Sequence, residues 1–437
     1  MTSLDTSTDS NTRERLPYEA DGLITGDSRI ALQREFAWPK HSWRHNTWNP
    51  TWPTEWRQSV SLFALREYML TGELDLVDSF AASLLNQTQI GCIAERSTGL
   101  VDYGACPHQS GGMGVQSKIR DIVDWPEKSR DGYVMGDINT VVNAYAIAGI
   151  RALVRLGRAG GGASGGLPAH VEALEAQVKT TALAVNALCT NATSGLYYDG
   201  YDAAKKAPIA HSAWHAQVFP AAFGLAPEVR WPSILAFLKE KGMAGSVYAA
   251  YWALKAAYNM DVDHGALALQ LLTSCDENSW CHMLNVGATA VMEAWSRREK
   301  PNLSWSHPWA SAPASAVVWG FFGITPTTPG FRTFVFKPQP GSVASASIKV
   351  PTLSGNIVAT LAQTPGTAFA VTLAPPPGTR ATVCLPKLAL ATTTLVVDGI
   401  ATQGYAQRDY VCVDGIGSAK SSRKISRTLE ASYHLDI

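Results

Sequence analysis

Two glutamates of this chain lie in settings that suit proton transfer. Glu293 stands in the stretch GATAVMEAW (287–295), where its immediate neighbours are apolar. Burial among such neighbours disfavours the charged carboxylate and raises its pKa towards the range in which it exchanges protons at neutral pH. The alternative is a helix residue with its carboxylate in solvent, since acidic side chains are mostly exposed.

The second glutamate, Glu14, lies in DSNTRERLPYEAD (9–21), where acidic and basic residues alternate. Asp9, Glu14 and Asp21 surround Arg13 here. An arginine beside carboxylates lowers their pKa and can grip a carboxylate or sugar hydroxyls with both arms of its guanidinium. The alternative is a solvated helix start, because acidic residues favour a first turn.

A third polar cluster precedes a long predicted helix at 139–156. Asp124, Trp125, Arg130 and Asp131 lie in the loop that leads into it. Loops that enter the helices of a barrel are where a site is expected. One of the aspartates is also expected to cap the helix.

Histidines and tryptophans supply further candidates. The spacing of His211 and His215 would place both on one helix face, but no third ligand follows at a metalloprotease spacing, so sugar contacts or structural hydrogen bonds are favoured over a metal. Downstream of Glu293, the cluster Trp305, His307 and Trp309 offers apolar faces with polar tips. Such a surface suits a sugar ring, which is apolar on its faces and hydroxylated at its rim.

Composition excludes several classes of partner. The 437 residues are 46% hydrophobic and 16% charged, and the formal net charge is zero. This balance gives no electrostatic reason to expect nucleic acid or an anionic membrane surface as a partner. No charged-then-apolar leader follows Met1, and no apolar run reaches the ~20 residues of a membrane helix. The compartment and the oligomeric state stay open.

The cysteines do not indicate a structural metal site. Seven are scattered along the chain without paired CxxC spacing, so neither a zinc site nor a full disulfide framework is implied. Cys384 and Cys412 both fall in the strand-rich part of the chain and would pair in an oxidising compartment.

The elements that must position these residues are mainly helices. The aromatic and proline-rich text from Ala31 to Trp56 predicts a rigid connection rather than a regular element. Helical periodicity then recurs to about residue 322, including the segment around Glu293, and no strand pattern interrupts it. A run of helical hairpins this long predicts a toroid of paired helices, an (α/α)6 barrel with an inner and an outer ring.

After Thr325 the pattern changes to short alternating segments between Pro and Gly turns, which predicts a small antiparallel β-sandwich. We therefore expect the barrel at 1–325, the sandwich at 326–415, and a polar tail at 416–437, disordered or loosely docked.

Several motifs together resemble one family. RERLPYEADGLITG, WPTEW, VDWPEKSRDGY, HSAWHAQVFPAAFGL, ENSWCHML, GATAVMEAW, SHPW and PGFRTFVFKPQPG look like the bacterial-type α-L-rhamnosidases, glycoside hydrolases built on a six-hairpin barrel. The order of motifs matches from about Asp9 to Gly341. Relatives carry β-rich domains ahead of the first motif, whereas this chain begins a few residues before it, so we expect either a fragment or the loss of those domains.

The resemblance implies roles for individual residues. The family's acid motif, D-C-P-x-R-x-E-R with a later aspartate, is matched by Asp9, Arg13, Glu14 and Asp21, although Ser10 and Asn11 replace its cysteine and proline. Glu14 would then be the general acid, with Asp9 and Asp21 holding sugar hydroxyls. Glu293 would be the general base, with Met292 where an aromatic residue usually precedes it. By the same resemblance the sugar contacts would include His307, Asp124, Trp125 and Trp280.

The resemblance also implies inversion at the anomeric carbon of a terminal α-L-rhamnose. The two carboxyl groups would then be ~6.5–9.5 Å apart, with a water between the base and the sugar. No motif suggests a cofactor or a metal. The alternatives are a catalytically inactive carbohydrate-binding protein that keeps the aromatic cleft, and another six-hairpin glycosidase.

Overall fold

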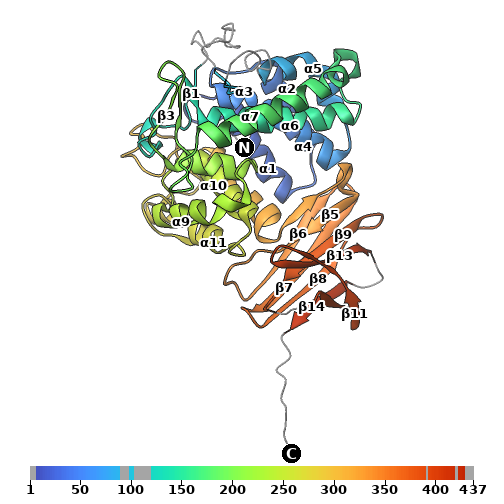
Figure 1. Ribbon diagram of the computed structural model, residues 1–437. Coiled ribbons are helices and arrows are strands. Elements are labelled where there is room, and N and C mark those ends of the chain that lie inside the picture. Colours follow the sequence, from blue (N-terminus) through green and yellow to red (C-terminus); the bar gives the residue numbers. More distant parts are fainter. Residues whose placement is uncertain (1–5, 89–97, 103–119, 390–391, 419–421, 429–437) are drawn as a thin grey trace, which may run out of the picture.

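A ring of helices forms the larger part of the chain and a β-sandwich forms the rest (Figure 1). The computed structural model describes residues 6–88, 98–102, 120–389, 392–418 and 422–428. Within these residues no helix is both long and apolar enough to cross a bilayer.

The inner ring consists of helices whose residues are mostly buried, and these alternate along the chain with more exposed outer helices. The inner helices are α1 (Glu19–Leu32), α4 (Val60–Thr71) with the short α3 (Thr54–Gln58), α6 (Thr140–Arg158), α8 (Trp214–Ala222), α10 (Val247–Met260) and α13 (Ala312–Ala316), which a π-helical turn (Val317–Phe321) extends. The outer helices are α2 (Ala37–Trp48), α5 (Asp75–Gln87), α7 (Val171–Leu188), α9 (Trp231–Lys241), α11 (Ala266–Thr273) and α12 (Trp280–Asn285).

The ring closes where its first and last inner helices meet. Helix α1 packs against α13, while α4 packs on α6, α6 on α8, α8 on α10 and α10 on α13. The (α/α)6 toroid predicted from the sequence is therefore confirmed. Closure brings the two ends of the helical region together, which is what the pairing of Glu14 with Glu293 requires.

The sandwich follows directly after the π-helical turn. One sheet has the strand order β11-β10-β14-β8-β7-β6 and the other β12-β13-β9-β5-β4. Only β5 and β9 pair in parallel among the described strands of these two sheets. The strands are β4 (Ile324–Pro326), β5 (Thr333–Phe336), β6 (Ser345–Thr352), β7 (Gly355–Thr364), β8 (Ala368–Ala374), β9 (Arg380–Pro386), β10 (Thr394–Val397), β11 (Ile400–Gln403), β12 (Tyr405–Gln407), β13 (Tyr410–Gly417) and β14 (Arg423–Thr428).

Two sequence predictions about strands are wrong. A small sheet of β1 (Ile138–Asn139), β2 (Gly200–Asp202) and β3 (Ala207–Ile209) lies among the helices. The polar tail is not wholly irregular, because β14 pairs with β8 inside the six-stranded sheet. Ile425 of β14 is fully buried there, and one apolar residue among basic ones gave too weak an alternation to recognise. Residues 429–437 lie outside the described part.

The prediction of an irregular connection at Ala31–Trp56 is wrong because α2 occupies much of it. Pro39 lies in the first turn of α2. The backbone N–H groups of a first turn have no acceptor within the helix, so proline, which lacks this group, removes no helical hydrogen bond there. The Glu35 carboxylate accepts hydrogen bonds from the first free backbone N–H groups, at 2.6 Å from Ala37 N and 3.1 Å from Trp38 N. Proline and tryptophan therefore mark a capped helix start here.

The segment around Glu293 is a loop, and the predicted helix there is wrong. Glu293 N donates to Ser304 O (2.9 Å) and His307 N donates to Val291 O (2.8 Å). The two arms of the segment thus bond to each other across the loop. These tertiary bonds replace the local i to i+4 bonds that the alanine-rich text favours.

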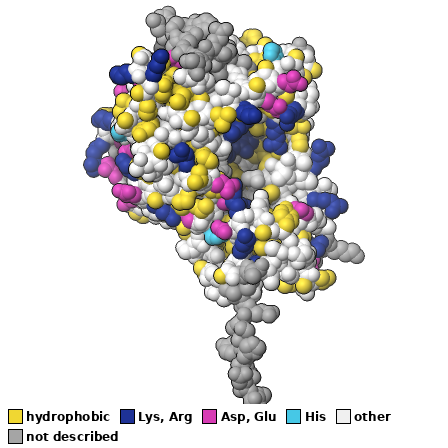
Figure 2. Space-filling model, viewed as in Figure 1, with side chains coloured by type: hydrophobic (Ala, Val, Ile, Leu, Met, Phe, Trp, Pro, Cys, Tyr) yellow, Lys and Arg dark blue, Asp and Glu magenta, His cyan; other side chains and the backbone are white. Residues whose placement is uncertain are grey.

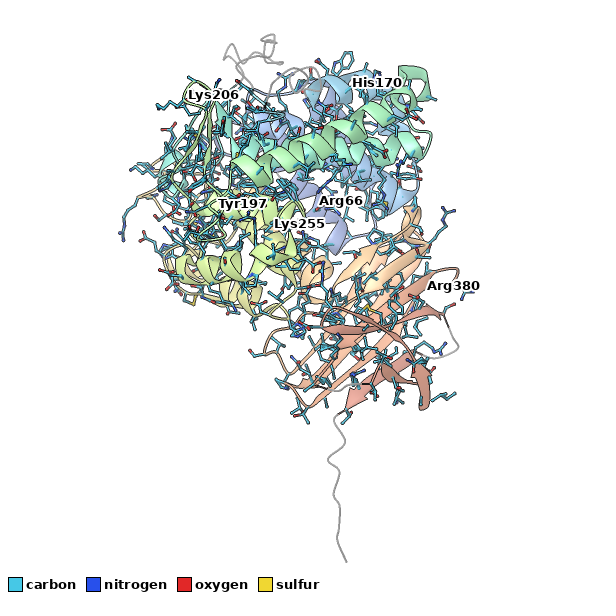
Figure 3. The ribbon with its side chains drawn as sticks, viewed as in Figure 1. Arg66, His170, Tyr197, Lys206, Lys255 and Arg380 are labelled. Atoms are coloured by element: carbon cyan, nitrogen blue, oxygen red, sulfur yellow. A yellow bond between two sulfur atoms is a disulfide. The ribbon has the colours of Figure 1, made fainter. Side chains whose placement is uncertain are left out.

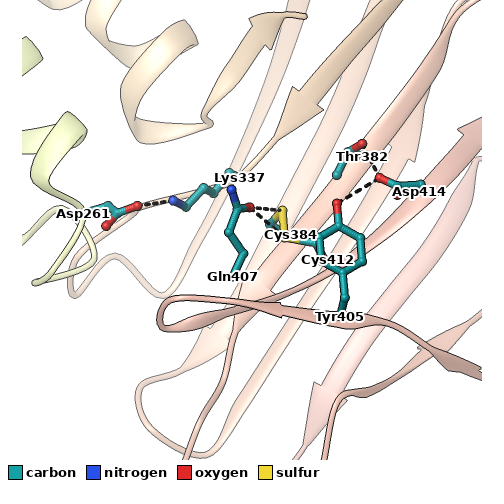
Figure 4. Close-up of a disulfide and its surroundings, with 8 residues drawn as sticks. All are labelled: Asp261, Lys337, Thr382, Cys384, Tyr405, Gln407, Cys412 and Asp414. Atoms are coloured by element: carbon teal, nitrogen blue, oxygen red, sulfur yellow. Dashed lines mark hydrogen bonds and ion pairs between the residues drawn. A yellow bond between two sulfur atoms is a disulfide. The ribbon is translucent and has the colours of Figure 1, made fainter. Parts of the chain in front are cut away.

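Among the described residues, disulfides join two pairs of cysteines. The predicted Cys384–Cys412 pair is present between β9 and β13, and Figure 4 shows it beside Gln407. A second pair, Cys275–Cys281, was not expected from the spacing.

Candidate active site

Glu14 lies at the tip of a loop that Asp9 closes. Asp9 N donates to Leu16 O (2.8 Å), and Leu16 N donates to Asp9 Oδ1 (2.9 Å). Ser10 Oγ donates to the other carboxylate oxygen of Asp9 at 3.1 Å. Burial raises the pKa of Asp9. The loop is therefore pinned at its base, which presents Arg13 and Glu14 together.

Glu293 is fixed by its own loop. Ser304 N donates to Glu293 Oε2 at 2.7 Å, and Trp309 Nε1 donates to the Glu293 carbonyl at 3.0 Å. The side chain of Glu293 is only 3% exposed. Backbone and side chain are thus both anchored, which leaves Oε1 as the oxygen available to other groups.

Arg13 joins the two glutamates. Its Nη2 donates to Glu293 Oε1 at 2.5 Å, and its Nη1 donates to Glu14 Oε1. Lys300 Nζ lies 3.4 Å from the same Glu293 oxygen. Tyr18 OH donates to Glu14 Oε2 at 3.0 Å. Two like charges would repel at short range, and the guanidinium between them removes that cost.

The two carboxylates differ in exposure. The Glu14 side chain is 34% exposed, against 3% for Glu293. One carboxyl group therefore lies at the rim of the site and the other at its enclosed end. This asymmetry matters for the chemistry that each can perform.

Asp21 and His307 form a buried pair beside the glutamates. His307 Nε2 lies 2.9 Å from Asp21 Oδ1, and both side chains are less than 5% exposed. Burial raises the pKa of Asp21, and His307 opposes that rise. If Nε2–H donates to Asp21, His307 Nδ1 is left as an acceptor. Nδ1 is buried and has no hydrogen-bond partner among the described residues.

These groups line one cavity of about 200 Å³. Its polar members are Asp9, Glu14, Asp21, Glu293 and His307, and its other walls are largely aromatic. Trp56 and Trp309 meet edge to face with ring centroids 6.2 Å apart, and Tyr248 stacks on Trp309 at 5.8 Å. The volume is below the roughly 300–1,000 Å³ of drug-sized ligand pockets, which suits a single ring.

Asp124 lies outside the cavity lining, and its carboxylate is already used. It is fully buried and accepts hydrogen bonds from Trp125 N (2.8 Å) and Ser246 N (2.8 Å), while His215 Nε2 lies 2.6 Å away. Arg130 Nε donates to the Asp124 carbonyl at 3.0 Å. These contacts connect the loop before α6 to α8 and to the first turn of α10. Trp125, in contrast, does line the cavity.

Four other predicted substrate-binding residues, Arg130, Asp131, His211 and Trp280, also lie outside the cavity lining. Asp131 bonds to Trp214 N and to Lys241 Nζ, each at 2.9 Å. His211 Nδ1 lies 2.5 Å from Asp199, and Trp280 Nε1 donates to Ala310 O at 2.7 Å. Their roles as sugar contacts stay predictions.

His211 and His215 do not share a helix face, because α8 begins only at Trp214. That prediction is wrong. Among the described residues, one group of carboxylates is compact enough for a metal ion, namely Glu67, Glu73 and Asp75. Lys40 Nζ lies within ion-pair distance of all three, so each of these carboxylates already has an ammonium group as a partner.

The sequence predictions did not assign a role to several residues that line the cavity. These are Tyr18, Trp52, Trp56 and Ile122, whereas Trp309, which the sequence placed in a sugar-binding cluster, does line the cavity. The stretch WNPTWPTEW held a signal for Trp52 and Trp56. Tryptophans beside prolines at the start of an inner helix lie at the mouth of a barrel. Tyr18 and Ile122 had no such signal.

Comparison with known proteins supplies the family. A model of the bacterial α-L-rhamnosidase six-hairpin glycosidase domain matches residues 39–318, and one of the C-terminal domain matches residues 323–397. No curated protein sequence matches.

Solved structures show the same fold. An α-L-rhamnosidase of Streptomyces avermitilis, solved with L-rhamnose, has a TM-score of 0.71 and 16% identity, covering 98% of this chain and 40% of its own. The α-L-rhamnosidase of Dictyoglumus thermophilum has a TM-score of 0.71 and 13% identity, covering 98% and 48%. This chain thus spans less than half the length of either. With its barrel and its sandwich both matched, the chain belongs to the bacterial α-L-rhamnosidase family of glycoside hydrolases.

Proposed function

We propose that this protein hydrolyses terminal α-L-rhamnosides with inversion at the anomeric carbon. The observation that carries the proposal is the pairing of Glu14 with Glu293 across one small cavity with aromatic walls. The aromatic faces suit the apolar faces of a sugar ring. His307, which lines the cavity, is the proposed contact for one of its hydroxyls.

Glu14 acts as the general acid in this proposal. It is the more exposed carboxyl group, at the rim, where a leaving group can extend into solvent. Protonation of the glycosidic oxygen there allows the aglycone to depart as an alcohol.

Glu293 acts as the general base. It is enclosed, and Arg13, Lys300 and Ser304 N all stabilise its negative charge. A water held against Glu293 Oε1 loses its proton to the carboxylate as it attacks the anomeric carbon from the face opposite the leaving group. The product is then β-L-rhamnose.

The test combines two variants with two substrates. Glu293→Gln is expected to abolish hydrolysis of both p-nitrophenyl and methyl α-L-rhamnoside, since each needs the attacking water. Glu14→Gln is expected to retain more activity on the nitrophenyl substrate, whose phenolate leaves without a full proton transfer. The exposed Glu172→Gln is the control and should be unchanged.

Proton NMR of the first-formed sugar decides the stereochemistry. Initial β-anomer supports inversion, whereas initial α-anomer overturns the assigned roles. Absence of rhamnoside hydrolysis by the unaltered protein, with L-rhamnose still bound, would instead identify a carbohydrate-binding protein. Hydrolysis of another p-nitrophenyl glycoside in preference to the rhamnoside would identify a glycosidase with a different substrate.

A further inference from the structure

A second cavity occupies the other end of the inner ring. It has a volume of about 330 Å³. Helix α10 spans the distance between the two, because Tyr248 in its first turn stacks on Trp309 of the candidate active site, while Lys255 and Asn259 line the second cavity. Helix α1 also runs from one cavity to the other, because its Asp21 lines the candidate active site and its Asp27 lines the second cavity.

The walls of this second cavity are mainly apolar. They come from inner helices, with β4, Phe331 and β6 on the side of the sandwich. Figure 2 shows a hollow on this face with Lys and Arg side chains at its walls, and Figure 3 labels Arg66 and Lys255 in the same region. An apolar pocket with a few convergent polar groups is the usual form of a small-molecule site.

Positive charge exceeds negative charge in the lining. Arg66, Lys255 and Arg155 line the cavity, whereas Asp27 is the one carboxylate among its described lining residues. Asp27 is already shared, because Arg66 Nη2 lies 2.7 Å from its Oδ2 and Tyr251 OH donates to the same oxygen at 2.6 Å. The carboxylate is therefore bonded directly to Arg66, whereas it attracts Lys255 only from beyond ion-pair distance.

Lys255 has aromatic neighbours instead of a carboxylate. Its Nζ lies 4.8 Å from the Trp319 ring centroid and 5.8 Å from that of Tyr251. No ion pair joins it to any described carboxylate of the lining. Burial, with Arg66 adding repulsion, lowers the pKa of Lys255 to about 7. The site thus holds an ammonium group that lacks a counter-ion.

The helix dipole does not stabilise the positive charge of Lys255. Cations are stabilised near helix C-termini, but that effect falls off within the last turn. Helix α10 continues to Met260, which places Lys255 more than one turn before its end. Its ammonium group points into a cavity, not at free carbonyl groups.

We propose that this second cavity binds a small amphipathic carboxylate, with its acid group on Lys255 and Arg66 and its apolar body against Trp319 and the leucines of α4. A carboxylate can bind two cationic groups with charge-assisted hydrogen bonds. The apolar walls exclude a strongly hydrated anion such as phosphate. The proposal does not depend on rhamnoside hydrolysis.

Calorimetry with 3-phenylpropanoate tests it. Binding is measured at about pH 6 with the candidate active site saturated by L-rhamnose. One equivalent is expected to bind, and 3-phenylpropan-1-ol, acetate and inorganic phosphate should each bind at least about tenfold more weakly. Equal affinity for 3-phenylpropan-1-ol would show that the cavity recognises only the apolar part of the ligand, which would contradict the proposal. Competition by L-rhamnose, or no binding of 3-phenylpropanoate at millimolar concentration, would also overturn the proposal.

Variants locate the ligand. Lys255→Met keeps the length of the side chain and removes its charge, so the fold should be retained or stabilised while affinity for 3-phenylpropanoate falls at least about tenfold. Lys205→Met, at a lysine whose side chain is 81% exposed, is the matched control and should bind normally. Unchanged affinity in Lys255→Met would contradict the assignment.

The pH dependence provides a second readout. The titratable and charged groups that face Lys255 are Asp27, Arg66, Arg155 and Tyr251. The pKa of Lys255 itself lies near 7. Affinity should be highest at about pH 5.5 to 6.5, where the ligand is a carboxylate and Lys255 is protonated, and it should fall as pH rises through 7 to 8, as Lys255 loses its proton. In Lys255→Met this slope should disappear, and its persistence would count against Lys255.

Discussion

Arg13 shows what a single residue contributes to the candidate site. Its guanidinium holds one carboxylate on each arm, Glu14 on Nη1 and Glu293 on Nη2. The likeness of DSNTRERLPYEAD to the family's acid motif predicted that Arg13 belongs to the site. It could not predict that Arg13 lies between the two glutamates, because that depends on how a loop at residue 13 meets a loop at residue 293.

Arg13→Lys should lower kcat/KM for an α-L-rhamnoside by roughly 10²-fold, the scale of a small misplacement of reacting groups. A lysine carries one compact charge and cannot bridge two carboxylates as the planar fork does. Steady-state kinetics measure the change, and circular dichroism checks the fold. Arg15→Lys is the control, since Arg15 is exposed and bonds only to Asn11 O within the described contacts. A kcat/KM within twofold of the unaltered protein would exclude a bridging role for Arg13.

At the scale of elements, the helices were predictable, whereas the loops that carry the proposed catalytic residues were not. Helices α6 and α10 are buried along most of their length, and an apolar segment of that length is typical of a helix and too long for a strand. The loop around Glu293 reads as a helix by composition, and only its bonds to Ser304 and Val291 decide otherwise. Its shape is a tertiary property. The resemblance to a family found Glu293 where local pattern gave the wrong element.

Asp124 illustrates a residue that positions elements. By resemblance it was expected to contact the sugar, yet its carboxylate bonds to Ser246, His215 and Trp125. Asp124→Ala should lower the free energy of unfolding by about 3–5 kcal/mol, because it leaves several buried donors without an acceptor. Urea denaturation measures it.

The control for Asp124 is Glu127→Ala, whose side chain is 68% exposed in its pair with Arg130 and should change the stability little. Loss of activity in Asp124→Ala with an unchanged free energy of unfolding would restore the sugar-contact role instead.

At the scale of the whole molecule, charged residues join the barrel to the sandwich. Asp261, which ends α10, pairs with Lys337 and lies 3.2 Å from Arg408 Nη1. Figure 4 shows the Asp261–Lys337 pair beside the disulfide. Arg408 also pairs with Glu228 and lies over the Trp231 ring at 4.4 Å. The sequence located the change from helix to strand near residue 325, but it gave no information about these contacts.

Asp261→Asn should weaken this junction. Asparagine tolerates the left-handed backbone found here, φ 45°, so strain is avoided, while Lys337 loses its counter-charge. We expect a loss of about 1–3 kcal/mol in the free energy of unfolding, measured by urea denaturation. Asp398→Asn, which removes an exposed pair with Arg423 inside the sandwich, is the control and should have a smaller effect. Equal effects would mean that the junction contributes no more than a surface ion pair.

Stability should also depend on pH through buried glutamates. Burial raises the pKa of Glu55 to about 8 and that of Glu19 to about 7, from an ordinary value of 4.5. The folded state therefore binds these protons more tightly than the unfolded state does. Their stabilising contribution is complete below pH 4.5 and is lost as pH rises through 7 to 8.

Glu55→Gln keeps a neutral side chain of the same shape, so the fall in unfolding free energy between pH 5 and 8 should be shallower than in the unaltered protein. Chemical denaturation at a series of pH values measures both slopes, and Glu172→Gln serves as the surface control. Parallel slopes would show that Glu55 titrates alike in the folded and unfolded states.

The meeting of α1 with α13 decides when the candidate active site can form. Arg13 and Glu293 are 280 positions apart, so the site that holds the proposed acid and base, Glu14 and Glu293, forms by one of the longest-range encounters available to this chain. Contacts between distant positions are slow to form because the intervening segment must first be ordered. The proposed proton donor, Glu14, precedes α1, and it meets its proposed partner only when the final hairpin docks and completes the ring. Recovery of turnover after dilution from denaturant would consequently report the last event of folding rather than the first.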